Sequence, residues 1–178
     1  LKVGTFNGDQ DFKTFIDQSF QTIAEQNIRQ LIIDFRGNGG GDEANAIHLY
    51  SYLSQEAFRY YDRYEVKTPA SILQDQKFTL VSYETINALF NVSDPAPQSD
   101  NRLIDASKLE DRLIDPEKLR APASKNGFTG PLVVLIDGGS FSATSEICAI
   151  MARDQRATFI GTETGGGFDG NTSGIYDF

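Results

Sequence analysis

Apolar residues in the first third of the chain follow two periodicities. Leu31 to Phe35 is a continuous apolar run apart from Asp34, which is typical of a buried strand. Two stripes at helical spacing flank this run and predict amphipathic helices, the first of them capped by Asp9 or Asp11. A short strand is expected over residues 1–6. The stripes consist of Phe12, Phe15, Ile16, Phe20 and Ile23, and of Ala46, Ile47, Tyr50 and Leu53.

The middle of the chain is less regular. Residues 58–66 are rich in aromatic side chains and predict an exposed edge strand or ribbon, and residues 83–90 predict a short helix. Residues 91–122 are polar and contain proline, and the motif Arg-Leu-Ile-Asp at 102–105 recurs at 112–115. We interpret 91–122 as an inserted surface excursion, either a plain loop or a lid over the site.

Regular structure returns in the last third of the chain. The patterns predict a strand over 132–136, a helix over 142–153 and a buried strand over 157–161. Strands that alternate with helices in this order indicate an α/β fold with a mostly parallel sheet flanked by helices. We expect residues 1–178 to form a single domain, with the excursion as an insertion.

Composition narrows the class of protein. The chain has 178 residues, of which 39% are hydrophobic, and no apolar run approaches the roughly 20 residues that span a bilayer. A formal net charge of −9 argues against nucleic acid as a partner. Cys148, the only cysteine, is expected to be a small buried hydrophobe. No cluster has the spacing of metal ligands, and we expect no metal and no cofactor.

A serine-bearing segment follows the strand at 132–136. The turn Asp-Gly-Gly at 137–139 leads into Ser140, Ser142 and Ser145, near the start of the predicted helix. The first amides of a helix have no intrahelical partner, so Ser142 could act as a nucleophile while the amide of Ala143 binds the developing oxyanion. The alternative is that one of these serines only caps the helix. Ser140 and Ser145 are reserve candidates for the nucleophile.

A second glycine-rich segment follows the strand at 31–35. Glycines at such a bend present backbone N–H groups outward, so Gly39, Gly40 or Gly41 could supply a second oxyanion donor. The segment lacks the lysine and hydroxyl of a P-loop. A bare turn is the alternative, but two glycine-flanked strand ends, one of which bears serine, favour a composite site.

Three segments carry a family resemblance. Leu-Ile-Ile-Asp-Phe-Arg-Gly-Asn-Gly-Gly-Gly (31–41), Leu-Ile-Asp-Gly-Gly-Ser-Phe-Ser-Ala-Thr-Ser-Glu-Ile (135–147) and Phe-Ile-Gly-Thr-Glu-Thr-Gly-Gly-Gly (159–167) resemble, in order, motifs of the C-terminal processing (tail-specific) and tricorn-core serine peptidases. The resemblance covers most of residues 1–56 and 130–178. It implies a crotonase/ClpP-like spiral of ββα units, hydrolysis of peptide bonds, and an oxyanion hole made by the amide of Ala143 and the loop Gly39–Gly41.

Two departures from the family pattern concern catalysis. Ser142 lies four residues before Glu146, whereas the family nucleophile usually lies three before, a position that Ala143 occupies here. The loop at 164–167 lacks the lysine of the tail-specific branch, which places the chain nearer the tricorn-like branch with its histidine base. His48, the only histidine, is interpreted as structural. The base is therefore expected upstream of Leu1, in N-terminal modules that this chain lacks.

Two carboxylates and one arginine are supporting candidates. Asp34 is expected to be a buried hydrogen-bonding partner of the glycine loop, Glu163 to cap or brace a loop, and Arg36 to bind a substrate carboxylate or form an ion pair. The resemblance implies a peptide or unfolded-protein substrate and an exported, extracytoplasmic bacterial protein. Alternatives are a non-catalytic ligand- or peptide-binding module that keeps the fold, and a crotonase-type acyl-thioester enzyme, against which the serine motif argues.

Overall fold

The computed structural model describes residues 1–8, 10–61, 64–66, 81–82, 103–104, 112–114 and 120–167. The chain divides into two compact units, one made of Leu1–Tyr60 with Arg120–Phe178 and the other of Tyr61–Leu119. The first unit carries all three segments of the predicted site. The helix predicted over 83–90 lies outside the described residues, as does most of the excursion predicted over 91–122, and the division into one domain with an insertion stays a prediction.

Three helices of the first unit form where the apolar stripes predict them. They are α1 (Gln10–Glu25), α2 (Glu43–Ser51) and α5 (Ala143–Arg153). Phe12, Ile16 and Phe20 of α1 are buried at four-residue intervals, so they share one helix face. Helix α2 begins at a side-chain cap, because the carboxylate of Asp42 accepts a hydrogen bond from the amide of Ala44.

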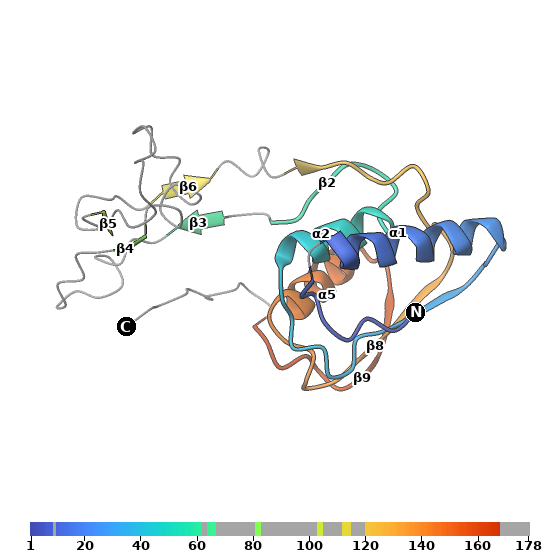
Figure 1. Ribbon diagram of the computed structural model, residues 1–178. Helices are drawn as coiled ribbons and strands as arrows, with labels where there is room; N and C mark the ends of the chain where they lie inside the picture. Colours follow the sequence, from blue (N-terminus) through green and yellow to red (C-terminus); the bar gives the residue numbers. More distant parts are fainter. Residues whose placement is uncertain are drawn as a thin grey trace. The chain divides into compact units, whose positions relative to one another are not determined.

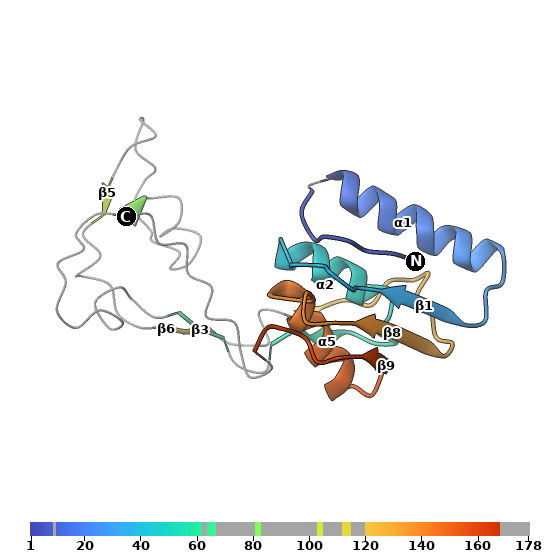
Figure 2. The ribbon, with the colours of Figure 1, turned by 90° about the horizontal axis from the view of Figure 1, so that it is seen from below.

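A parallel sheet supports these helices. Its strands are β1 (Leu31–Asp34), β8 (Leu132–Ile136) and β9 (Thr158–Gly161), in the order β1-β8-β9 (Figure 2). Both strand pairs are parallel, so the predicted α/β fold with a parallel sheet is confirmed. The predicted strand over 1–6 pairs only through isolated parallel bridges of Lys2 with Asp34 and of Phe6 with Gly41. The spiral of ββα units stays a prediction.

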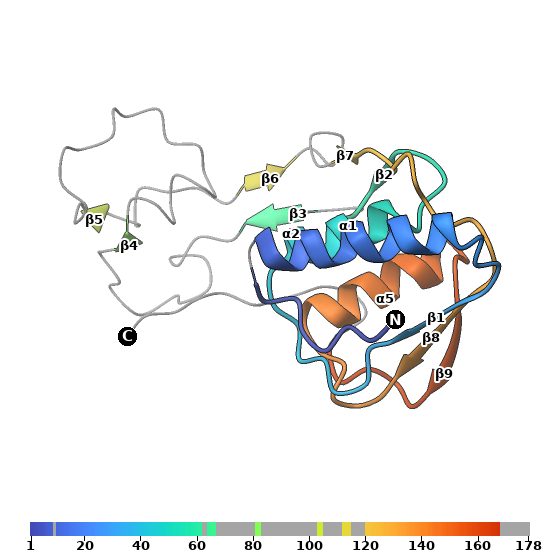
Figure 3. The same ribbon diagram turned by 45° about the vertical axis from the view of Figure 1, so that its right-hand side comes forward.

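The three helices lie on one side of the sheet (Figures 1 and 3). Ile33 and Val134 are neighbours in the register and point into the core beneath the helices, where each is fully buried. On the opposite face Ile32 is 54% exposed and Ile160 is 56% exposed. The prediction that the last strand is buried is therefore wrong, because no described segment covers that face of β9. The burial of Cys148 is confirmed.

The remaining strands are short antiparallel pairs. In the first unit β2 (Phe58–Arg59) pairs with β7 (Arg120–Ala121), and in the second β3 (Tyr64–Val66) pairs with β6 (Arg112–Ile114) and β4 (Val81–Ser82) with β5 (Leu103–Ile104). The ribbon predicted over 58–66 therefore contains two strands with different partners. Within the described residues no helix is long and apolar enough to cross a membrane.

Candidate active site

Two bends meet at the carboxyl ends of neighbouring strands. Strands β1 and β8 are adjacent and parallel, so the bends at 35–41 and 137–142 leave the same edge of the sheet. A Cβ atom added to Gly40 would lie 2.8 Å from the Cβ of Ser142 and 3.1 Å from the nitrogen of Ala143. The glycine loop therefore packs directly against the start of α5, and the two segments predicted to share a site are in contact.

Ser142 occupies a strained backbone position. Its backbone angles, φ 53° and ψ −126°, lie in a region that residues with a side chain rarely adopt. The residue stands at the junction of the bend and α5. Such a conformation costs about 1–3 kcal/mol and is characteristic of functional sites. The hydroxyl makes no capping hydrogen bond and the residue is half-buried, so the alternative that Ser142 only caps the helix is wrong.

The two reserve serines have structural partners. Ser140 is fully buried, and its Oγ donates to the carbonyl of Phe35 at 3.0 Å and accepts from the amide of Asp137 at 3.1 Å. The Oγ of Ser145, also buried, donates to the carbonyl of Ser140 at 3.2 Å. Both hydroxyls are buried and donate to backbone carbonyls, which leaves Ser142 as the accessible serine of the segment.

The glycine loop and the start of α5, which meet at Ser142, carry the predicted oxyanion donors. Within the described ranges, no acceptor is found for the amides of Ala143, Gly39 or Gly41. The amide of Gly40, in contrast, donates to Oδ1 of Asn38 at 2.9 Å. Gly40 is thus not a free donor, and of the predicted oxyanion donors Ala143 and the exposed Gly39 remain, with Gly41 as the further member of the loop.

Asn38 holds the glycine loop from within. It is fully buried, and its Nδ2 donates to the carbonyl of Val3 at 2.9 Å while its Oδ1 accepts from Gly40. Its own carbonyl accepts from the amide of Phe141 at 2.9 Å, which links the two bends. Asn38 was not among the residues selected from the sequence. The signal that could have found it was one amide side chain within a run of glycines, a setting in which asparagine often binds the nearby backbone.

Asp137 was also not selected. Its Oδ1 accepts from the amide of Gly37 at 2.9 Å and from the amide of Gly139 at 2.9 Å. These hydrogen bonds, chiefly the one from Gly37, hold the pKa of the Asp137 carboxyl below its usual range. The residue looked like an ordinary turn aspartate, because its partner Gly37 lies 100 residues away in sequence.

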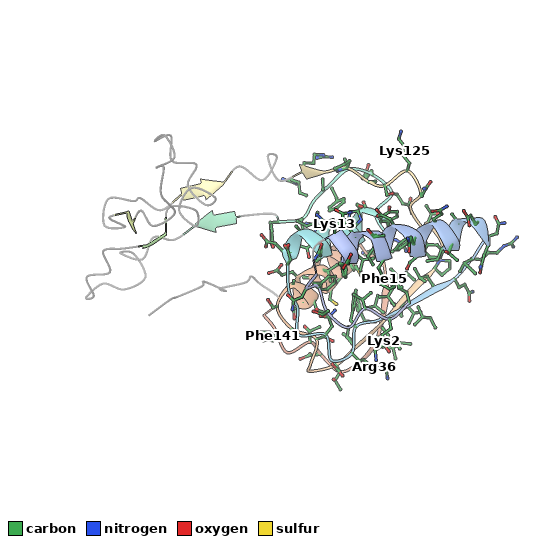
Figure 4. The ribbon with its side chains drawn as sticks, viewed as in Figure 1. Lys2, Lys13, Phe15, Arg36, Lys125 and Phe141 are labelled. Atoms are coloured by element: carbon green, nitrogen blue, oxygen red, sulfur yellow. The ribbon has the colours of Figure 1, made fainter. Side chains whose placement is uncertain are left out.

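A third glycine loop packs against the other side of Ser142. The amide of Gly165 donates to the carbonyl of Ser140 at 2.9 Å, and a Cβ added to Gly166 would lie 3.1 Å from the nitrogen of Ser142. Glu163, in the same loop, is exposed. Phe141, just before Ser142, is 52% exposed and lies at the surface (Figure 4). The third loop thus approaches Ser142 with backbone and no side chain.

Asp34 has a different partner from the one expected. Its oxygens accept hydrogen bonds from the guanidinium of Arg36 at 2.9 and 2.8 Å and from the amide of Arg36 at 3.1 Å. These contacts hold the pKa of Asp34 far below its usual range, with the side-chain hydrogen bond as the main cause. The expectation that Asp34 is a buried partner of the glycine loop is wrong, and Arg36 forms an ion pair.

His48 makes its side-chain contact with Asp17 of α1. Its Nε2 lies 2.6 Å from Oδ1 of Asp17, which also accepts a hydrogen bond from the hydroxyl of Tyr52 at 2.8 Å. These contacts join α2 to α1 and agree with a structural role. In the described part of the chain, no histidine or lysine contacts the Ser142 hydroxyl, and no group of three residues is arranged to hold a metal ion.

Comparisons with known proteins identify relatives. The family model described as peptidase family S41 matches residues 1–174. No curated protein sequence matches the chain. Solved structures that resemble it include the photosystem II D1 C-terminal processing protease (TM-score 0.54, 17% identity, 92% of this chain and 30% of that one) and mature CPAF (0.59, 18%, 92% and 37%). Another is a putative peptidase from Parabacteroides merdae ATCC 43184 (0.53, 18%, 93% and 40%).

At these identities the likeness to solved structures concerns the fold. The chain spans 30–40% of the length of the three structures.

Proposed function

The chain belongs to peptidase family S41, and on that premise we propose that Ser142 is the nucleophile of a serine peptidase. The predicted resemblance to the C-terminal processing peptidases is confirmed at the level of the family. The observation that carries the proposal is the strained Ser142, whose hydroxyl makes no capping hydrogen bond and whose Cβ, like the amide of Ala143, lies against the glycine loop. A strained serine at a strand-to-helix turn is a recurring way to present a nucleophile.

The proposed reaction proceeds through an acyl-enzyme. Ser142 Oγ attacks the carbonyl carbon of the peptide bond and gives its proton to a general base. The amides of Ala143 and Gly39 bind the oxyanion, and the N-terminus of α5 favours the negative charge. Collapse of this intermediate expels the protonated amine and leaves an ester on Ser142, which water then hydrolyses to release the second product.

The proposed base lies outside the residues that the structure describes. The described part of the third loop approaches the Ser142 segment through Gly165 and Gly166, which have no side chain that could accept a proton. This arrangement fits the tricorn-like branch, in which a histidine serves as base. We propose extended or unfolded peptide segments as substrates and an extracytoplasmic location for the protein.

The second candidate function is a non-catalytic peptide-binding module. In the described residues no histidine or lysine contacts Ser142, and this favours the binding module, because a serine without a base is a poor nucleophile at neutral pH. Such a module would keep the bends and their free amides, which can bind a peptide carbonyl or carboxylate without cleaving it.

Labelling with a fluorophosphonate tests the proposal in the intact protein. We expect a covalent adduct on Ser142, located by peptide mapping, which disappears in Ser142→Ala. Hydrolysis of unfolded β-casein should fall by about 10³-fold or more in that variant. Ser19→Ala is the matched control, because Ser19 only donates to the carbonyl of Phe15 on the exposed face of α1. A folded protein that neither labels nor cleaves would overturn the peptidase and support the binding module.

A further inference from the structure

We propose that Asp137 is a positioning residue that sets the distance between Ser142 and the glycine loop; this inference rests on the proposed function. The carboxylate lies where two backbone bends come together. Its Oδ1 accepts from Gly37 in the first bend and from Gly139 in the second, each at 2.9 Å. One oxygen atom therefore joins segments that lie 100 residues apart in sequence.

The backbones of the two bends touch at this point. A Cβ added to Gly139 would lie 3.0 Å from the Cα of Gly37 and 3.2 Å from Oδ1 of Asp137. Gly37 itself has a φ of 71°, a conformation that glycine adopts without strain. Because the two backbones lie this close at Gly139, one oxygen of the Asp137 carboxylate reaches an amide of each bend.

Ser140 reinforces the link beside Asp137. Its amide donates to the Asp137 carbonyl at 2.9 Å, and its hydroxyl connects the Asp137 amide to the carbonyl of Phe35. At the next residue along the chain, the amide of Phe141 donates to the carbonyl of Asn38. The residues just before Ser142 are thus tied to the first bend by three hydrogen bonds, of which Asp137 provides the one with a charged acceptor.

The spacing of the two bends matters because the oxyanion needs donors from both. Donors at about 2.7–3.1 Å from the oxyanion are effective, and loss of one costs about 10²–10³ in kcat. A displacement of about 1 Å can cost about 10²-fold. In Asp137→Ala the amides of Gly37 and Gly139 lose their acceptor and the first bend can move relative to α5. We expect kcat to fall about 10–100-fold with little change in KM.

Two conservative variants separate geometry from charge. Asp137→Asn keeps an oxygen with two lone pairs at the same distance, so activity should stay within about 3-fold of wild type. Asp137→Glu keeps the charge but moves the oxygen by one methylene, so kcat should fall while KM remains. Asp17→Ala is the matched control, because the Asp17 carboxylate also accepts two hydrogen bonds but joins α1 to α2.

The decisive readout in the intact protein is binding of a peptide aldehyde relative to the corresponding peptide alcohol. The aldehyde forms a tetrahedral adduct with the serine and uses the oxyanion donors, whereas the alcohol reports peptide binding alone. We expect Asp137→Glu and Asp137→Ala to weaken the aldehyde at least about 10-fold more than the alcohol. We expect Asp137→Asn and Asp17→Ala to leave the ratio unchanged.

The possible results separate the positioning role of Asp137 from the proposed function. If Asp137→Ala does not fold, the folded Asp137→Asn and Asp137→Glu variants still give the comparison, with circular dichroism as the check. Aldehyde-to-alcohol ratios equal to wild type in Asp137→Glu, or an Asp137→Asn variant as impaired as Asp137→Glu, would overturn the positioning role. Failure of the wild-type protein to label with fluorophosphonate would instead overturn the proposed function.

Discussion

The two bends of the candidate site both contain residues with a positive φ, but the residue types at those positions differ. In the first bend the positive φ values fall on glycines, with 71° at Gly37, 100° at Gly40 and 141° at Gly41. In the second bend the positive φ of 53° falls on Ser142, which has a side chain. Glycine adopts such values without steric cost, whereas serine does not. Between these two bends, only the proposed nucleophile combines a side chain with a positive φ.

Glycines of the first bend differ among themselves as well. Gly40 combines a positive φ with close contact to the second bend, whereas Gly39 has neither, since nothing lies within 4 Å of a Cβ added there. Packing therefore requires a glycine at position 40, whereas nothing around position 39 excludes a side chain.

The largest effect on stability is expected from Gly40→Ala. The new methyl group would lie 2.8 Å from both the carbonyl oxygen of Phe141 and the Cβ of Ser142, on a strained backbone. We expect the free energy of unfolding to fall by about 3 kcal/mol or more. Gly39→Ala is the matched control and should stay within about 0.5 kcal/mol of wild type. Chemical denaturation measures both, and equal losses would contradict the distinction between the two glycines.

Asn38→Ala should have the next largest effect. The substitution leaves the buried amide of Gly40 without its acceptor and the carbonyl of Val3 without its donor. Unsatisfied buried groups of this kind cost about 1–3 kcal/mol each, so we expect a loss of about 2–4 kcal/mol. Asn126→Ala, at an exposed asparagine, is the control. A loss below about 0.5 kcal/mol for Asn38→Ala would show that the first bend holds its shape without this brace.

Ser142→Gly should act in the opposite direction. Glycine relieves the strain at φ 53° and ψ −126°, so we expect the protein to gain about 1 kcal/mol of stability while it loses the proposed nucleophile. Ser142→Ala keeps the Cβ and the strain and should remain close to wild type in stability. Thermal unfolding of the two variants is the measurement. A glycine variant less stable than the alanine variant would contradict strain at this position.

The smallest effect concerns pH. The folded-state pKa of Asp137 lies below the ordinary value of 3.8, so the ionised carboxylate contributes stability above that value, and the contribution is lost as pH falls through the folded-state pKa. The contribution of the Asp34 carboxylate to stability is also lost on acidification, because its hydrogen bond from Arg36 lowers the pKa of Asp34 as well. The difference in melting temperature between wild type and Asp137→Asn should therefore shrink as the pH is lowered from about 6 to about 3. A constant difference would contradict a charged link between the bends.

Much of the architecture followed from local patterns. The stripe of α1, the apolar runs of β1 and β8, and the glycines that end those runs each report the conformation of a few neighbouring residues. Because parallel neighbouring strands end at one edge, the two motifs predicted adjacent bends, and the structure brings these bends into contact. Burial of β9 was predicted wrongly, since an apolar run does not reveal whether both faces of its strand are covered.

The sequence by itself determined which segments bend and which residue types stand at the bends. Only the tertiary structure decided how those residues are used: that Ser140 and Ser145 are buried links while Ser142 stays accessible, that the amide of Gly40 belongs to Asn38, and that Asp137 joins the bends. The physical reason is that a hydrogen bond depends on which groups meet in space. A pattern of neighbours in sequence cannot specify a partner 100 residues away.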